Sequence, residues 1–145
     1  MLLGDAEFVE QARVWLRRFG GNLFQLHPYV ASAAMRFDDA LSQMPKYMRR
    51  ANEVYEILKD IPQIKFCPAP PQVNMFHLYF DSSVEKLKAA RDRIAENDKI
   101  WAANHFQTTA LENSCYTEIY VGQGLLAIAD DELLETFLKL VNAAE

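Results

Sequence analysis

The chain has few of the residues from which self-contained catalytic and metal sites are built. Its 145 residues include two cysteines and three histidines. The histidines form neither an HxxxH nor an HExxH pattern, so we predict no metal site. The sequence also has no GxSxG, GxxxxGK[ST] or GxGxxG motif, which removes the signatures of hydrolase elbows, phosphate-binding loops and dinucleotide-binding folds. None of the lysines has the shielded, cation-rich context that a Schiff-base lysine needs. We therefore predict no catalytic residue within this chain.

The sequence also lacks an excess of positive charge and any long apolar run. The formal net charge is -5, which argues against nucleic acid as a partner because phosphate binding needs a clustered basic surface. No apolar run approaches the roughly 20 residues that cross a bilayer, and the start does not have the pattern of a targeting peptide. Cys67 and Cys115 form no CxxC pair, so we expect reduced thiols in the cytoplasm, with a single disulfide left open.

Half of the residues are hydrophobic, and their spacing predicts two helices in the first part of the chain. Asp5 is a good N-cap for a helix that ends at Gly20-Gly21-Asn22, since glycine and asparagine tolerate the left-handed conformation after a helix. Pro28 suits a first helical position. An apolar stripe then continues to Asp60, as one long helix bent at Pro45 or as two helices in series.

The pattern then changes to strands that alternate with helices. We expect strands at 64–67, 73–80, near 106–110 and at 116–121. Ser82 and Glu85 form a capping-box pattern before another helix, Gly122-Gln123-Gly124 is expected to turn the chain, and Asp130 is expected to cap the last helix. His77, inside a strand, is interpreted as a core or edge histidine.

This order predicts an α+β fold, with long N-terminal helices followed by a small, mostly antiparallel sheet that has helices on one face. We place residues 1–60 in a helical linker or interface segment and residues 61–145 in a C-terminal α+β domain. The helical front end has little of its own to pack against. We therefore expect homo-oligomers, formed through Phe8, Trp15 and the stripe from Tyr29 to Leu41.

Several stretches of the chain, taken in order, resemble one enzyme family. They are 4–8, Ala12-Arg13, the run Arg17-Arg18-Phe19-Gly20-Gly21-Asn22 with Gln25, the proline loop 70–76, and 117–122 followed by Asp130-Asp131-Glu132. Together they resemble the part of threonine aldolases that follows the cofactor lysine. These aldolases are β-eliminating lyases, pyridoxal-phosphate enzymes of the aspartate-aminotransferase fold. The match spans essentially the whole chain and well under half of the family's usual length.

The resemblance implies that this chain is the small domain, with linking helices, of a fold-type I lyase that cleaves 3-hydroxy amino acids to glycine and an aldehyde. The family's large domain and cofactor lysine would lie upstream, so we expect the isolated chain to be inactive and to hold no pyridoxal phosphate. The resemblance implies five cofactor-binding residues: Arg17, Arg18, Gly20, Gly21 and Gln25. Two positions depart from the family pattern. Phe24 stands where an arginine is common, and residues 108–126 contain no arginine for a substrate carboxylate.

Two other interpretations compete with a lyase fragment. One is a stand-alone, non-catalytic dimerisation or interaction module. The apolar start Met1-Leu2-Leu3-Gly4 argues against it, because a free terminus is usually polar. The other is an unrelated small α+β ligand-binding domain with His27, Arg17 and Arg18 at a pocket.

Overall fold

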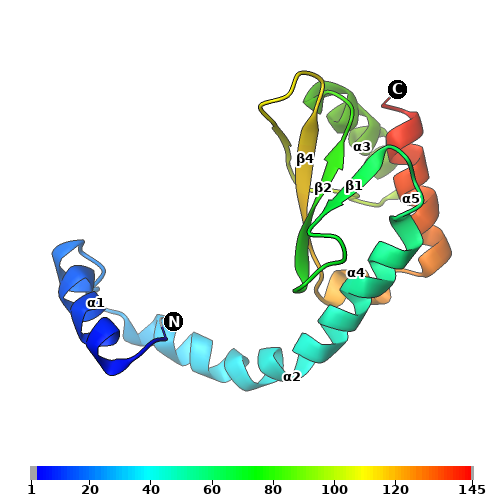
Figure 1. The fold of residues 1–145 in the computed structure, drawn as a ribbon. Helices are drawn as coiled ribbons and strands as arrows, with labels where there is room; N and C mark the ends of the chain where they lie inside the picture. The colour runs from blue at the N-terminus through cyan, green and yellow to red at the C-terminus, as the bar shows by residue number, and fades with distance from the viewer. Residues whose placement is uncertain (1–2, 145) are drawn as a thin grey trace. The chain divides into compact units, whose positions relative to one another are not determined.

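The computed structural model describes residues 3–144, so Met1 and Leu2 of the apolar start lie outside the described part. The chain divides into two compact units, residues 1–42 and 43–145, which are described separately. The elements, all but β3 labelled in Figure 1, follow in this order: α1 (Ala6–Arg18), α2 (His27–Leu58), β1 (Ile64–Cys67), β2 (Met75–Phe80), α3 (Val84–Asp98), β3 (Phe106–Thr108), β4 (Cys115–Tyr120), α4 (Gln123–Ala127) and α5 (Asp130–Asn142).

The first unit consists of α1 and the beginning of α2. The predicted N-cap is confirmed, because the Asp5 side chain accepts a 2.8 Å hydrogen bond from the Phe8 N–H. Arg17 and Arg18 lie in the last turn of α1, where positive charge suits the helix dipole. None of the residues of α1 is buried. The apolar stripe expected from the sequence is therefore largely exposed within this unit.

Of the two alternatives for the second helical segment, the structure has one helix. α2 continues through Pro45, and its buried residues all lie beyond that proline: Tyr47, Arg50, Ala51, Val54 and Leu58. The four apolar residues among them belong to the core of the second unit, which begins after Ser42. The division into a 1–60 linking segment and a 61–145 small domain stays a prediction.

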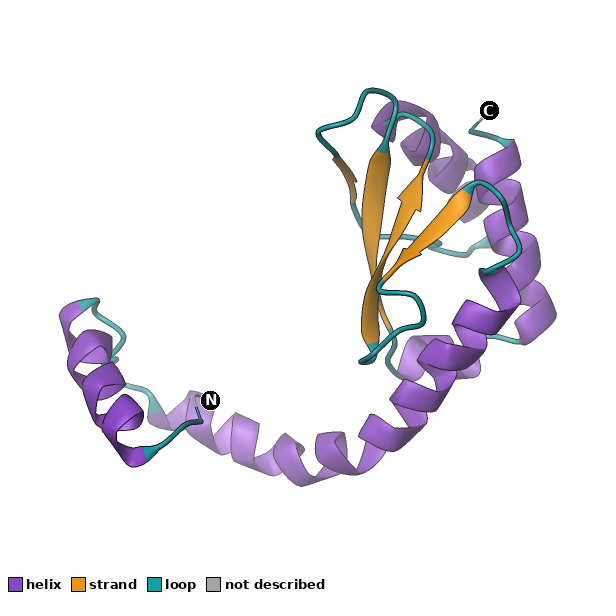
Figure 2. Cartoon of the chain, in the orientation of Figure 1, coloured by secondary structure: helices purple, strands orange, loops and turns teal. Residues whose placement is uncertain are grey.

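The second unit is built on a four-stranded antiparallel sheet with the order β1-β2-β4-β3. Side chains alternate along β2, where Phe76, Leu78 and Phe80 are buried. Helices α3 and α5 lie together on one side of this sheet (Figures 1 and 2), and their apolar residues join the same core. Full burial of one such side chain contributes about 1.5–3 kcal/mol. The α+β fold with helices on one face is therefore confirmed.

The N-caps of two helices, α3 and α5, differ from the sequence prediction. Ser83, not Ser82, caps α3, since its hydroxyl accepts from the Lys86 N–H. The Ser82 hydroxyl instead donates to the Ala144 carbonyl at 2.8 Å. The prediction that Asp130 caps the last helix was also wrong: the cap position is Ala129, and Asp130 is the first helical residue.

The segment after β4 also differs. The turn expected at Gly122-Gln123-Gly124 opens the short helix α4, with Gly122 at its N-cap position. This helix was missed because two glycines in three residues are more typical of a turn than of a helix.

Candidate functional site

The residues that the family resemblance implies for cofactor binding lie at the turn that ends α1. Gly20 has a φ of +72°, a conformation that glycine adopts without strain. A Cβ on Gly21 would come within 2.4 Å of the Leu16 Cδ1, so a side chain at this position would displace the end of the Leu16 side chain.

The backbone N–H groups of this turn are already hydrogen-bonded within the chain and are not available to an anion. The Gly20 N–H donates to the Arg17 carbonyl at 3.3 Å, and the Gly21 N–H donates to the Leu16 carbonyl at 2.8 Å. The end of a helix also carries the negative pole of its dipole. Anion binding at this turn therefore depends on the guanidinium groups of Arg17 and Arg18 and on the Gln25 amide.

The two arginines differ in their surroundings. The Arg18 guanidinium lies over the Trp15 ring, 5.1 Å from its centroid, and Trp15 stacks on Phe19. Both arginines and Gln25 are exposed. The assignment of these residues to cofactor binding stays a prediction.

A hollow of about 870 Å³ lies beside this turn, between α1 and the start of α2. Its lining is mostly apolar: Val9, Ala12, Arg13, Leu16, Gly21, Leu26, Tyr29, Val30 and Ala33. Arg13 contributes the positive charge in this lining, and its side chain also pairs with Glu10 at 3.4 Å. Neither Arg17, Arg18 nor His27 lines the hollow. The structure therefore does not gather those three residues at this hollow, as the ligand-binding interpretation requires.

Lysine and cysteine chemistry has little support in the described residues. Hydrogen bonding to Glu56 raises the pKa of Lys59, and hydrogen bonding to Asp98 and Glu135 raises the pKa of Lys139. A Schiff-base lysine needs a shift in the opposite direction. Cys67 is exposed, whereas Cys115 is buried and forms no disulfide.

Burial raises the pKa of the Cys115 thiol to about 11, with a further contribution from the charge of Glu85. A thiol with that pKa is protonated at neutral pH and is a poor nucleophile. Within residues 3–144, no group of three or more His, Cys, Asp or Glu side chains could hold a metal ion.

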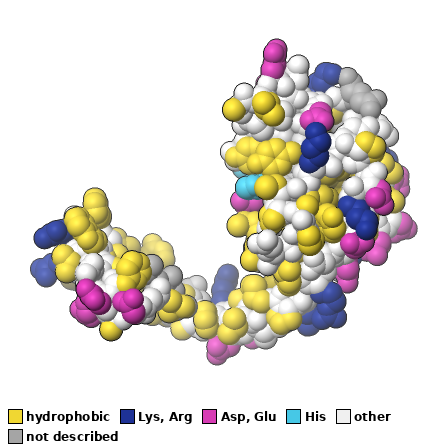
Figure 3. Space-filling model, in the orientation of Figure 1, with side chains coloured by type: hydrophobic (Ala, Val, Ile, Leu, Met, Phe, Trp, Pro, Cys, Tyr) yellow, Lys and Arg dark blue, Asp and Glu magenta, His cyan; other side chains and the backbone are white. Residues whose placement is uncertain are grey.

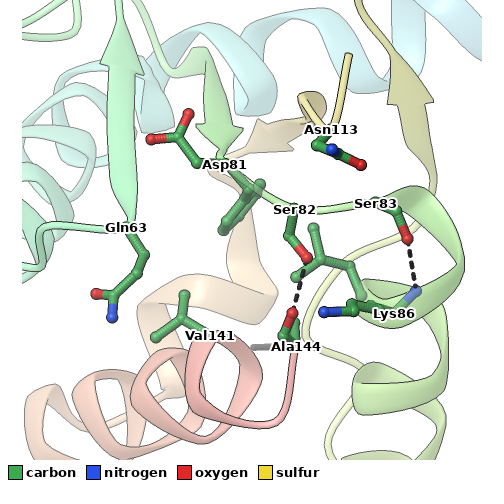
Figure 4. A pocket seen from close by; sticks show the side chains of 10 residues that line it. Gln63, Asp81, Ser82, Ser83, Lys86, Asn113, Val141 and Ala144 are labelled. Atoms are coloured by element: carbon green, nitrogen blue, oxygen red, sulfur yellow. Dashed lines mark hydrogen bonds between the residues drawn. The ribbon is translucent and has the colours of Figure 1, made fainter.

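The second unit has a hollow of about 390 Å³ beside the start of α3 (Figure 4). Ser82 and Ser83 line it, but their hydroxyl groups are engaged by Ala144 and by the Lys86 N–H. Asp81, at the same place, pairs with Lys65 at 2.8 Å. These contacts secure the end of the chain against α3 and indicate a structural role for the polar groups of this hollow.

The surface that the sequence prediction missed is the open face of the sheet. His77 lies on β2, between β1 and β4, with 39% of its side chain exposed. It is therefore neither a core nor an edge histidine. Figure 3 shows a histidine among hydrophobic side chains on the surface of the second unit. Strand alternation places His77 and Tyr79 on the same side of β2, and Tyr116 and Glu118 on the same side of β4. The pairing register brings these two pairs together on one face of the sheet.

Comparison with known proteins identifies relatives of this architecture. No family model and no curated protein matches the chain. A solved structure from Exiguobacterium sp. 255-15, assigned as an aromatic amino acid β-eliminating lyase/threonine aldolase, matches with a TM-score of 0.78 and 28% identity. A second, from Listeria monocytogenes EGD-E and assigned as an L-allo-threonine aldolase, matches with a TM-score of 0.78 and 29% identity. Each match covers 97% of this chain.

This chain resembles the C-terminal portion of a threonine-aldolase-like β-eliminating lyase. It spans 39% of the length of each of the two proteins. The recognition made from the sequence is thereby confirmed, and so is its fold class. No helix of the described residues is long and apolar enough to cross a membrane.

Proposed function

We propose that this chain is the C-terminal portion of a pyridoxal-phosphate-dependent lyase that cleaves 3-hydroxy amino acids to glycine and an aldehyde, in the cytoplasm. The observation that carries the proposal is the match to threonine-aldolase-like structures over 97% of the chain. When bound, pyridoxal phosphate supplies the electron sink for the carbanion that such a cleavage creates. The cofactor lysine and the ring-binding residues of the proposed enzyme belong to sequence outside these 145 residues.

In this proposal, the turn after α1 contributes positive charge to the cofactor phosphate. Arg17 extends from the last turn of α1 and can offer a phosphate two parallel N–H donors. Gly20 and Gly21 let the chain reverse tightly beside it. Arg18, lying on Trp15, adds charge with less freedom to move. Gln25 supplies an amide at the end of the same connection.

The first test is the DNA sequence immediately upstream of the Met1 codon. An in-frame extension that encodes a large domain, with a lysine shortly before Met1, would support the proposal. A stop codon with a ribosome-binding site would contradict a single-chain enzyme.

In the extended protein, Arg17→Ala should raise the dissociation constant for pyridoxal phosphate about tenfold or more, because a bidentate charged contact is lost. Arg36→Ala, which removes an exposed arginine of α2, is the matched control. Equal affinities in the two variants would remove Arg17 from the site.

The isolated chain provides a separate test. We expect incubation with pyridoxal phosphate and borohydride reduction to leave every lysine without stoichiometric label, since the sequence gives none of them the shielded, cation-rich context that a Schiff-base lysine needs. Peptide mapping by mass spectrometry would measure the label. One lysine labelled at full yield would overturn the expectation that the chain alone does not bond to the cofactor.

A second candidate function, a dimerisation module without catalysis, is favoured by the exposed apolar surface of the first unit. Phe19, Phe24 and Met35 are 82%, 99% and 82% exposed, which is costly for an isolated soluble surface. α1 is also self-complementary in charge, with Glu7 near its start and Arg17 near its end. Two copies related by a two-fold axis can place these charges opposite one another.

Sedimentation velocity across a concentration series tests this association. We expect self-association of the chain and its loss in a double variant, Phe8→Ser with Trp15→Ser. Leu111→Ser removes a 73% exposed apolar side chain of the second unit and serves as the control. A monomer at the highest concentration would contradict association through the first unit.

A further inference from the structure

The open face of the sheet brings together two pairs of side chains that the sequence keeps far apart. In the antiparallel register of β2 and β4, His77 lies opposite Glu118 and Tyr79 lies opposite Tyr116. The His77 Nε2 is 3.6 Å from the Glu118 Oε2. Side chains directly opposite on one face of an antiparallel pair are within contact distance. The register therefore places one carboxylate at the end of a row of rings.

The rings are held in place by contacts among themselves. The centroids of Tyr79 and Tyr116 are 5.3 Å apart in a stacked arrangement, and His77 is 5.1 Å from Tyr116 in a tilted one. The Tyr116 hydroxyl and the Gln107 Oε1 are 2.8 Å apart, which ties the outer end of that ring to β3. The aromatic surface is thus ordered before any ligand arrives, which lowers the entropic cost of binding.

A hollow of about 210 Å³ lies at the Glu118 end of this row. It is lined by His77, Asn104, His105, Gln107, Tyr116 and Glu118. Glu118 is the one carboxylate among these six residues. Half of its side chain, 53%, is exposed, so its carboxylate is accessible from solvent.

We propose that this hollow binds an organic cation, an ammonium or guanidinium group, between the Glu118 carboxylate and the faces of His77 and Tyr116. A carboxylate attracts such a group, and the negative face of an aromatic ring adds a cation–π contribution. The amide groups of Asn104 and Gln107 complete a polar rim. A small carboxylate or phosphate would be repelled by Glu118. The size of the hollow fits a single cationic head group, whether free or at the end of a lysine or arginine side chain.

The test is a titration of the isotopically labelled full chain, followed by NMR of the His77 and Tyr116 ring signals. The probes are n-butylammonium and methylguanidinium, with n-butanol as the uncharged control and acetate as the anion. We expect saturable shifts with the two cations and none with the controls. The proposal requires no pyridoxal phosphate, so its outcome is independent of the proposed lyase function.

Two variants make the test specific. Glu118→Gln should weaken cation binding about fivefold or more, and Tyr116→Leu should weaken it as well, whereas Glu112→Gln on an exposed loop should leave it unchanged. Dispersed amide spectra would confirm that each variant is folded. Saturable binding of acetate, binding by Glu118→Gln at the wild-type level, or shifts that never saturate would each overturn the proposal.

A final comparison distinguishes a small-molecule cation from a protein side chain as the ligand. A short peptide with one central lysine and blocked ends is compared with n-butylammonium in the same titration. Tighter binding of the peptide would support a protein side chain as the ligand, and tighter binding of the free amine would support a small molecule. Failure of both to bind would contradict the site.

Discussion

Replacement of Arg50 by alanine should destabilise the second unit more than the replacement of any exposed charged residue. Arg50 is 7% exposed, on the second half of α2. Its Nε donates to the Leu125 carbonyl at 3.0 Å and its Nη2 to the Ile128 carbonyl at 2.7 Å. Its Nη1 meets the carboxylates of Asp130 at 2.6 Å and Glu53 at 3.2 Å. One side chain therefore fastens the α4–α5 connection to α2.

The expected loss in the free energy of unfolding comes mainly from the two hydrogen bonds to carbonyl groups. A hydrogen bond from a charged donor contributes about 1.5–3 kcal/mol, so loss of the two backbone contacts costs about 3 kcal/mol at the lower end of that range. Glu53 and Asp130 are 48% and 68% exposed, so solvent screens their ion pairs and they add well under 1 kcal/mol each. Burial by itself would lower the pKa of Arg50, but its hydrogen bonds to Asp130 and Glu53 outweigh that effect and the pKa is raised.

The assay is urea unfolding followed by the fluorescence of Trp101, in a background that carries Trp15→Phe so that the signal reports the second unit. We expect Arg50→Ala to lower the free energy of unfolding by about 3 kcal/mol. Asp130→Asn, which keeps both carbonyl contacts, should cost less than about 1 kcal/mol. Arg49→Ala removes the exposed neighbouring arginine and should change stability by less than about 0.5 kcal/mol.

Two results would refute this reasoning. A loss below about 1 kcal/mol for Arg50→Ala would mean that water replaces the side chain at the two carbonyls. A loss of equal size for Asp130→Asn would mean that the ion pair, and not the carbonyl contacts, carries the energy. The loss for Arg50→Ala should also persist in 1 M salt, because partly buried contacts are screened much less than exposed ones.

Three further predictions concern the turn after α1 and the cysteines. Gly20→Ala should cost about 1 kcal/mol in the first unit, because its φ of +72° is strained for alanine; helical circular dichroism during urea unfolding measures this, and no loss would contradict it. At pH 8, iodoacetamide should label Cys67 and spare Cys115, whose pKa is about 11; mass spectrometry after a short exposure would detect the reverse. Above pH 9.0, the ordinary pKa of the thiol, Cys115 loses its proton in the unfolded state before it does so in the folded state. The free energy of unfolding should therefore fall as pH rises toward about 11, and Cys115→Ala should make this pH dependence smaller.

The helices and their ends illustrate what local sequence can decide. Asp5 caps α1 as predicted, because a cap needs only the few residues that follow it. The prediction that Ser82 caps α3 was wrong, and the cap is the next residue, Ser83. The decision depends on Ala144, at the other end of the chain, which accepts a hydrogen bond from Ser82. Asp130 failed as a cap for the same reason, because its carboxylate is paired with Arg50.

The sequence by itself determined the α+β class, the elements with strong periodicity and the resemblance to threonine-aldolase-like lyases. These depend on hydrophobic spacing and on motif order, which are properties of the sequence alone. Only the tertiary structure decided that β2 lies between β1 and β4, and that His77, Tyr79, Tyr116 and Glu118 share one open face. Strand order and register arise from pairing between distant segments, and a shift of one residue would turn each of these side chains to the opposite face. The proposed cation site is therefore a property of the fold and not of any local motif.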